Sequence, residues 1–384
     1  MMQKKGDSPK FEYLEAVFLI IGTIIGAGIF GVPYVISKSG ILPATLLFFL
    51  VAFVILLVHL FYGEIIKVYG LGHRLVGYTA LSFGKNWGKI SGGLFVLSVY
   101  GALLTYVLLG GLFLKNLLLP LWDVNLGMLQ VGFWCLGALL VFAGKYWIER
   151  VNVYLSLALI VIVSVLAIAA MSHATAPNFT YAVSGNFWVP FGVFLFALLG
   201  TSAIPEAANA LGKKKNSELS HAIIAGTLVA VLFTFLFGVS VVGLNGPYTT
   251  PEALLGMSGV LGQWVLSLGA AMGILAVTTS FLAIALNLEQ TYIRDWKIKQ
   301  PWAYLLTFVP VLAIYLIGAN NLIRVMSVTG GIFGGLLCIA ITLIYLKLYQ
   351  KKPSEIKFMR FPKVFPYFVI VAFALGIIME IASW

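Results

Sequence analysis

The chain has 384 residues, of which 61% are hydrophobic and only 10% are charged, and its formal net charge is +11. Soluble globular domains average about 25% charged residues, so the composition excludes an ordinary soluble protein and indicates an integral membrane protein with several spans. The two cysteines, Cys135 and Cys338, lie in different apolar segments. We therefore interpret them as packing residues and not as a redox or metal-binding pair.

Eleven apolar segments approach or exceed the roughly 20 residues that are needed to cross a bilayer. In chain order, the predicted spans cover residues 14–37, 41–66, 90–118, 127–144, 151–171, 188–211, 221–244, 262–288, 301–317, 322–346 and 364–383. Residues 1–13 precede them as a predicted cytoplasmic tail.

The positive charges indicate how these spans are oriented. If the N-terminus is cytoplasmic, all but three of the 24 lysines and arginines fall in cytoplasmic segments, the exceptions being Lys38, Lys115 and Arg324. This distribution follows the positive-inside rule. It predicts a multi-pass protein of the plasma (inner) membrane with its C-terminus outside, and it explains the net charge without a nucleic-acid partner. The sequence does not specify an oligomeric state.

Span one contains the stretch IIGTIIGAGIFGVPY at residues 20–34, which is rich in glycine and ends near Pro33. Each glycine inside a helix costs about 1 kcal/mol relative to alanine. One interpretation is close helix packing through Gly22-x-x-x-Gly26, a small-xxx-small pattern. The other interpretation is that the helix is interrupted here.

Span six repeats the spacing of this stretch. Pro205 follows Gly200 by five residues, just as Pro33 follows Gly28. Interrupted segments at corresponding positions of two halves are a sequence signal for a transporter site at the membrane midplane. We therefore favour breaks in spans one and six. The odd number of spans in each half gives the two halves, residues 14–171 and 188–346, opposite orientations, as in an inverted repeat, with residues 364–383 as an eleventh helix.

Broken helices expose backbone groups that can bind a zwitterion. Free N–H groups at Gly26, Ala27 and Gly28, at the start of the following half-helix, suit a carboxylate. Free carbonyls around Gly200 suit an ammonium group, so the pattern predicts an α-amino acid substrate. The predicted substrate-binding residues are Thr23, Gly26, Ala27, Gly28, Ile29, Phe196, Gly200, Thr201 and Ser202.

The stretches IGTIIGAGIFGVPYVISKSG, FLFALLGTSAIPEAANAL and GHRLVGYTALSFGKNWGK resemble the amino acid/polyamine/organocation transporter superfamily. Within it, they are similar to the amino acid/auxin permease and aromatic amino acid permease branch, and the resemblance covers essentially the whole chain. It implies an all-α, leucine-transporter-like fold with a five-plus-five inverted repeat and alternating access. Many members carry an acidic residue where this chain has Ser202, and this departure argues against a polyamine substrate.

The resemblance to sodium-coupled members also implies an ion site. Its ligands would be the carbonyls of Gly22, Ile25 and Leu275 and the hydroxyls of Thr278 and Thr279. The alternative is that the span-eight hydroxyls bond back to their own helix. Span five has no lysine, which disfavours one proton-coupled mechanism known among relatives. Sodium or a proton is the expected coupling ion, and no other cofactor is expected.

A few polar residues inside the spans have more than one interpretation. Glu206 in span six is a candidate gate or a structural partner of Lys213–Lys215, and less favourably a proton carrier. His59 in span two is expected to pack as a hydrogen-bonded side chain. Tyr100 and Tyr106 in span three are candidate lids, although core packing is the favoured interpretation.

Taken together, these patterns predict a secondary active transporter that imports neutral or aromatic amino acids with a cation. A membrane-embedded transferase is disfavoured because the thirteen acidic residues are scattered and do not gather at one face. A substrate-sensing receptor on a transporter scaffold is the main alternative, weakened by the lack of an extended cytoplasmic domain. A channel is disfavoured because no repeated pore-lining ring is evident. We expect no enzymatic activity.

Overall fold

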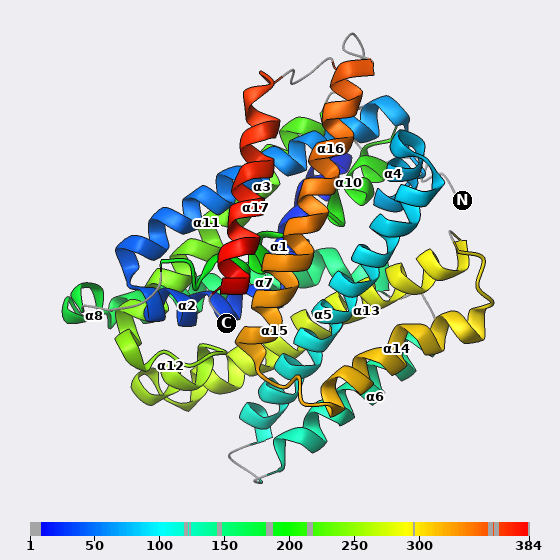
Figure 1. Ribbon diagram of the computed structural model, residues 1–384. Helices are drawn as coiled ribbons and strands as arrows, with labels where there is room; N and C mark the ends of the chain where they lie inside the picture. Colours follow the sequence, from blue (N-terminus) through cyan, green and yellow to red (C-terminus); the bar gives the residue numbers. More distant parts are fainter. Residues whose placement is uncertain are drawn as a thin grey trace.

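The computed structural model describes residues 9–118, 122, 124–143, 148–181, 187–212, 218–294, 296–351, 356 and 361–382. All regular secondary structure within these residues is helical, and long helices make up most of the molecule (Figure 1). In this described part of the chain, eight helices are long and apolar enough to cross a membrane. Three shorter apolar helices, Leu126–Phe142, Leu157–Ser172 and Gln300–Leu316, fall where spans four, five and nine are predicted. The count of eleven spans stays a prediction.

The first predicted half begins with an interrupted helix and continues with long ones. Its elements are α1 (Pro9–Ile24), the 3-10 helix η1 (Ala27–Gly31), α2 (Val32–Ser39), α3 (Ile41–Tyr69), α4 (Leu75–Phe83), α5 (Lys85–Leu118), α6 (Leu126–Ala143) and α7 (Ile148–Ser172). Gly40 joins α2 directly to α3 with a φ of 85°, a conformation that other residues adopt only with strain. The helix α5 starts before residue 90, where span three was predicted to begin.

The second predicted half also begins with an interrupted helix. After the short α8 (Pro177–Thr180), its elements are α9 (Phe191–Leu198), α10 (Ala203–Leu211), α11 (Leu219–Asn245), η4 (Gly246–Tyr248), α12 (Leu254–Leu261), α13 (Gln263–Arg294), α14 (Gln300–Leu316), α15 (Leu322–Ser327), η5 (Val328–Gly334) and α16 (Gly335–Lys351). The final helix is α17 (Val364–Ala382).

Span ten differs from the continuous helix that was predicted for residues 322–346. Its Gly-rich stretch VTGGIFG forms the π-helix η5, which separates α15 from α16. Single π-helical turns inside α-helices are rare and often occur at functional sites. The interruption lies where span ten packs against α9.

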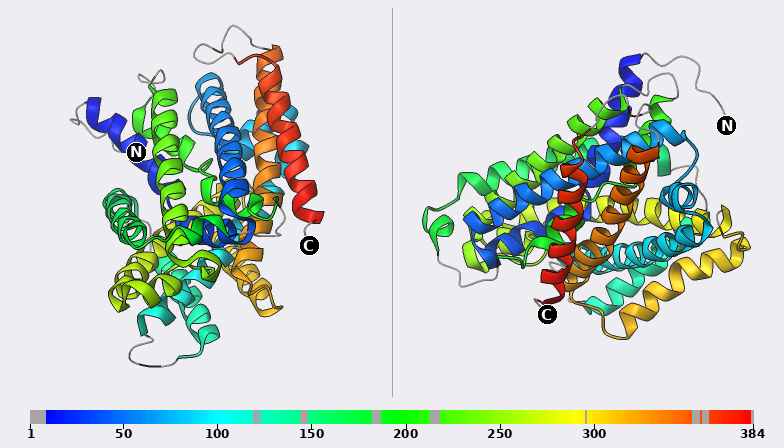
Figure 2. Two further views of the ribbon diagram at one scale, coloured as in Figure 1. Left: turned by 90° about the vertical axis from the view of Figure 1, so that its left-hand side faces the viewer. Right: turned by 45° about the horizontal axis from the view of Figure 1, so that its top comes forward.

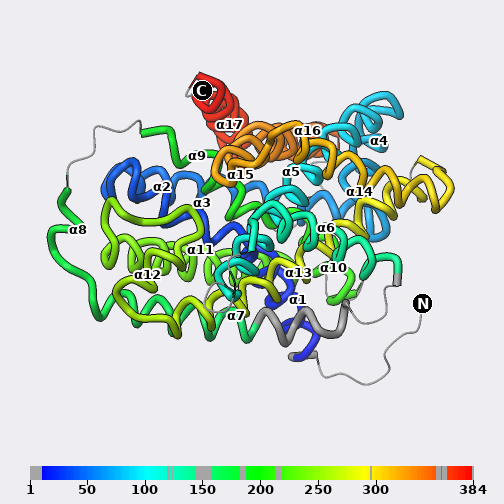
Figure 3. Tube along the Cα trace, turned by 90° about the horizontal axis from the view of Figure 1, so that it is seen from below, coloured from blue at the N-terminus to red at the C-terminus, as the bar shows by residue number. Residues whose placement is uncertain are grey.

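The two interrupted helices lie inside the bundle. The helix α1 packs against α10 and α11, and η1 packs against α9. Phe30 of η1 contacts the rings of Phe113 and Phe237 edge-on, with centroid distances of 4.8 and 6.1 Å. α16 and α17 run side by side (Figure 2). Viewed from below, α17 stands at one edge of the molecule, opposite α7 and α12 (Figure 3).

Candidate functional site

Span one is interrupted where the sequence predicts. The helix α1 ends at Ile24, and Gly26 has an extended conformation with φ −105° and ψ −152° before η1 begins. The N–H of Gly26 donates to the carbonyl of Ile24 at 2.8 Å, so the Gly22 carbonyl loses its helical partner. The N–H groups of Ala27 and Gly28 close no hydrogen-bonded turn with the preceding segment. The break therefore leaves both backbone N–H groups and a backbone carbonyl without helical hydrogen-bond partners.

Span six is interrupted between Leu198 and Ala203. The carbonyl of Gly200 accepts from the N–H of Ala203 at 3.0 Å, and the carbonyl of Thr201 accepts from that of Ile204 at 3.4 Å. These two carbonyls thus begin the next half-helix. The prediction that the carbonyls at Gly200 stand free is therefore wrong. The carbonyls that close no helical turn lie at the end of α9 and include those of residues 197–199. The acceptor end of the break lies about one turn earlier than the sequence predicts.

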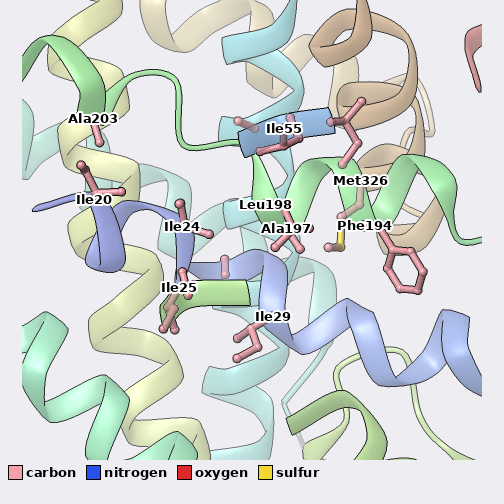
Figure 4. Close-up of a cluster of buried hydrophobic side chains, with 14 of the residues drawn as sticks. Ile20, Ile24, Ile25, Ile29, Ile55, Phe194, Ala197, Leu198, Ala203 and Met326 are labelled. Atoms are coloured by element: carbon pink, nitrogen blue, oxygen red, sulfur yellow. The ribbon is translucent and has the colours of Figure 1, made fainter. Parts of the chain in front are cut away.

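The two breaks touch one another. A Cβ atom on Gly28 would lie 2.6 Å from the Cα of Ala197, and one on Gly200 would lie 2.5 Å from Cγ1 of Ile24. Figure 4 shows the apolar side chains that surround this contact, including Ile24, Ile25 and Ala197. Gly28 and Gly200 therefore serve close packing as well as interruption. The packing interpretation of Gly22-x-x-x-Gly26 stays a prediction, because a Cβ on Gly26 would make only ordinary contacts at 3.5 Å.

His59 of α3 supports the break in span six. Its Nε2 atom accepts the N–H of Gly200 at 3.2 Å, and its Nδ1 atom lies 3.1 Å from Oγ1 of Thr227 in α11. Because Nε2 accepts, a neutral ring carries its proton on Nδ1 and donates it to the threonine. The sequence predicts a hydrogen-bonded packing residue at position 59, and the structure adds that its partner is the break itself.

Spans three and eight bring polar side chains toward the break in span one. The hydroxyl of Ser280 on α13 lies 3.5 Å from the position that a Cβ on Gly26 would occupy, and Tyr106 of α5 interacts with Ser280. The sequence assigns no ligand role to Ser280, because only its neighbours Thr278 and Thr279 match the sodium pattern. Tyr100 lies elsewhere, since its hydroxyl bonds that of Tyr292 at 2.7 Å.

The Thr279 hydroxyl of span eight shows the alternative arrangement that the sequence left open. Oγ1 of Thr279 donates to the carbonyls of Leu275 and Ala276 at 3.1 and 3.0 Å. On the other side, the hydroxyl of Thr23 donates to the Leu19 carbonyl at 2.8 Å. Both threonines are thus bonded within their own helices.

Glu206 forms an ion pair that joins two elements. Its Oε1 atom accepts from Nη2 of Arg74 at 3.1 Å, and the two side chains are 47% and 40% exposed. Arg74 immediately precedes α4, so the pair links α4 to α10. The predicted partners Lys213–Lys215 lie outside the described residues.

A bundle of apolar helices in which two interrupted helices meet at their breaks is the architecture of a secondary transporter. The chain belongs to the tryptophan/tyrosine permease family, whose model matches residues 10–382. It is therefore a multi-pass integral membrane permease and not an enzyme.

Individual relatives agree with this class. The chain is 20% identical to Glutamine transporter 2 of Aliivibrio fischeri over 357 residues, covering 90% of this chain and 91% of the relative. Its fold is similar to MhsT in complex with L-phenylalanine, with a TM-score of 0.69, 17% identity, and coverage of 96% of this chain and 98% of MhsT. Mhp1, a nucleobase-cation-symport-1 family transporter in a closed conformation with bromovinylhydantoin bound, gives a TM-score of 0.66 at 15% identity, covering 97% of this chain and 91% of Mhp1. The leucine-transporter-like fold is thus confirmed, whereas the inverted relation of the halves stays a prediction.

Proposed function

We propose that this permease is a secondary active amino acid transporter of the amino acid/polyamine/organocation superfamily, which imports neutral or aromatic amino acids by alternating access. One observation carries the proposal: the donor end of one broken helix and the acceptor end of another meet in the interior. The unused N–H groups of Ala27 and Gly28 suit a carboxylate, and the unused carbonyls of residues 197–199 suit an ammonium group. An α-amino acid carries both groups on one carbon.

The surroundings of the breaks favour a neutral side chain. Buried apolar side chains pack at the breaks, including Ile24 and Ala197 (Figure 4), and Ser202 stands where many superfamily members have an acid. Phe196, half-buried at the end of α9, is proposed to form one wall of the substrate site. The family description and the L-phenylalanine bound to MhsT support aromatic substrates, and the glutamine transporter supports a polar neutral one.

We propose sodium as the coupling ion, held by the carbonyls of Gly22, Ile25 and Leu275 and the hydroxyls of Thr278 and Thr279. The lost helical partner of the Gly22 carbonyl supports this set. The bonds of Thr279 to its own helix do not conflict with it, because they use the hydroxyl proton and leave oxygen lone pairs for a cation.

We propose that the Arg74–Glu206 pair is part of a cytoplasmic gate. Alternating access requires contacts that form in one state and break in the other. An ion pair this exposed contributes no more than about 1 kcal/mol, which suits a contact that opens in every cycle. In this proposal the N-terminus is cytoplasmic and the C-terminus is outside, in the plasma membrane.

A thermal-shift screen of the purified protein tests the substrate class. A ligand at a hundred times its Kd stabilises the folded state by about 2.7 kcal/mol. We expect stabilisation by neutral or aromatic amino acids, enhanced by sodium, and none by the matching amino acid amides or N-acetyl derivatives, which lack one charge of the zwitterion. Stabilisation by no amino acid would refute the proposal, and uptake into proteoliposomes would separate a transporter from a receptor.

A further inference from the structure

The hydroxyl of Thr234, in the middle of α11, is buried and has no hydrogen-bond partner. The side chain is 0% exposed, and among the residues that the structure describes none bonds to its Oγ1 atom. A buried polar group without a partner costs free energy, and in a native protein such a group needs an explanation. One explanation is that the hydroxyl serves a ligand that binds beside it.

Threonines inside helices commonly satisfy this hydroxyl from their own backbone. Other buried threonines of the chain donate to the carbonyl four residues earlier; they are Thr79, Thr105, Thr291, Thr307 and Thr342. Thr227, two turns before Thr234 on the same helix, lies 3.1 Å from the ring of His59 instead. The Thr234 hydroxyl forms neither kind of bond, so it remains available to a group beyond α11.

Thr234 lies on the face of α11 that packs against span one. At about 100° per residue, position 234 falls between Phe237 and Gly238 around the helix. The ring of Phe237 contacts Phe30 of η1 edge-on at a centroid distance of 6.1 Å, and a Cβ on Gly238 would lie 2.9 Å from Cγ1 of Val32. Both neighbours therefore contact span one just after its break.

Two contacts fix the level of Thr234 along span one. A Cβ on Gly226, earlier in α11, would lie 2.8 Å from Cβ of Ile20 in α1, whereas Gly238 meets Val32 in α2. The two spans therefore run in the same direction, and Thr234, two-thirds of the way between these glycines, lies level with η1, which α11 contacts. The unused N–H groups of the span-one break belong to the start of η1.

We propose that the Thr234 hydroxyl is a third donor to the carboxylate of the bound amino acid, beside the N–H groups of Ala27 and Gly28. Several donors gathered at one place suit an anion, and hydrogen bonds to a charged group are stronger than neutral ones. A cation would use the hydroxyl oxygen as an acceptor, but the unused backbone groups at the start of η1 are donors, which a cation does not bind. The inference rests on the proposed transport function, whose substrate site it extends to span seven.

The test measures equilibrium binding of L-tryptophan, L-phenylalanine and L-glutamine to the purified protein at saturating sodium. Thr234→Val replaces the hydroxyl by a methyl group in a side chain of the same shape. We expect the Kd of the amino acid that binds best to rise about 10- to 100-fold, because one hydrogen bond to a charged group is lost. The melting temperature of the ligand-free protein should stay equal or rise, because the variant removes a buried polar group that has no partner. A threonine with only a structural role would give the opposite shift.

Two control variants accompany this measurement. Thr234→Ser keeps the hydroxyl and should keep most of the affinity, and Thr342→Val removes a hydroxyl that bonds to its own helix and should leave the Kd unchanged. An unchanged Kd in Thr234→Val, or a lower melting temperature of its ligand-free form, would overturn the inference. A higher sodium requirement with an unchanged amino acid Kd at saturating sodium would also overturn it, because the hydroxyl would then serve the cation. If the wild type bound none of the three amino acids, the substrate class proposed above would be refuted, and this inference with it.

Discussion

The hydrogen bond from Gly200 to His59 allows a quantitative test of how the span-six break is held. In His59→Leu the ring is replaced by an apolar side chain of similar size, so the N–H of Gly200 loses its acceptor. A buried donor without a partner costs about 1–3 kcal/mol. Thr227 adds less to this cost, because a threonine hydroxyl in a helix can bond to its own backbone instead.

This penalty has two measurable consequences. The free energy of unfolding is expected to fall by about 1–3 kcal/mol. If the penalty falls on the form that binds substrate, the Kd of the amino acid rises by about 5- to 150-fold. Denaturant unfolding and equilibrium binding of the purified protein measure the two quantities separately.

Matched variants separate the hydrogen bond from packing. His59→Gln keeps an acceptor that can reach Gly200 and should recover much of the lost affinity. A double-mutant cycle of His59→Leu with Thr227→Val measures the coupling across the ring. A His59→Leu protein with wild-type stability, within about 0.5 kcal/mol, and with wild-type affinity would refute the supporting role of the histidine.

Three further predictions concern the breaks, the ion site and the loop before α12. Gly28→Leu should abolish uptake, because even a Cβ there would lie 2.6 Å from the Cα of Ala197; uptake assays on expressed protein check this. Thr279→Val should raise the sodium concentration needed for half-maximal uptake, because it removes one oxygen ligand. Burial raises the pKa of Glu252, which precedes α12, above its ordinary value. Its contribution to stability is therefore full at low pH and is lost as pH rises toward the raised pKa, so Glu252→Gln should melt less pH-dependently.

Each of these predictions has its own control. Gly93→Leu places the same side chain where a Cβ meets nothing within 4 Å, so it should retain uptake. Wild-type uptake by Gly28→Leu would refute the proposed carboxylate site. For the ion site, Thr279→Ser keeps the hydroxyl and should keep the wild-type sodium dependence. Uptake by the wild type that does not depend on sodium would refute the proposed sodium site. Equal pH dependence of melting in wild type and Glu252→Gln would contradict the reasoning for the loop.

The sequence predicts the features that local composition determines. Glycines followed by a proline weaken a helix wherever they occur, so the breaks near Gly26 and Gly200 can be located without coordinates. The apolar segments likewise predict the helices, although α5 and α13 extend beyond the predicted spans because a helix does not need to end where the membrane does.

Contacts between distant segments could not be predicted in the same way. The bond from His59 to Gly200 joins residues 141 positions apart, and Ser280 meets Gly26 only through the packing of α13. The π-helix of span ten was missed because its glycines fit an ordinary helix equally well. Thr234 lies within an apolar segment, and its position at the level of η1 becomes evident only when α11 is packed against span one.

The central claim is that backbone groups at two helix breaks bind the two charges of an amino acid. An experimental structure of the protein with a bound neutral or aromatic amino acid tests it most directly. The account predicts the carboxylate within hydrogen-bond distance of the N–H groups of Ala27 and Gly28, and the ammonium group at the carbonyls of residues 197–199. An amino acid bound away from both breaks, or helices that run unbroken through them, would contradict the account.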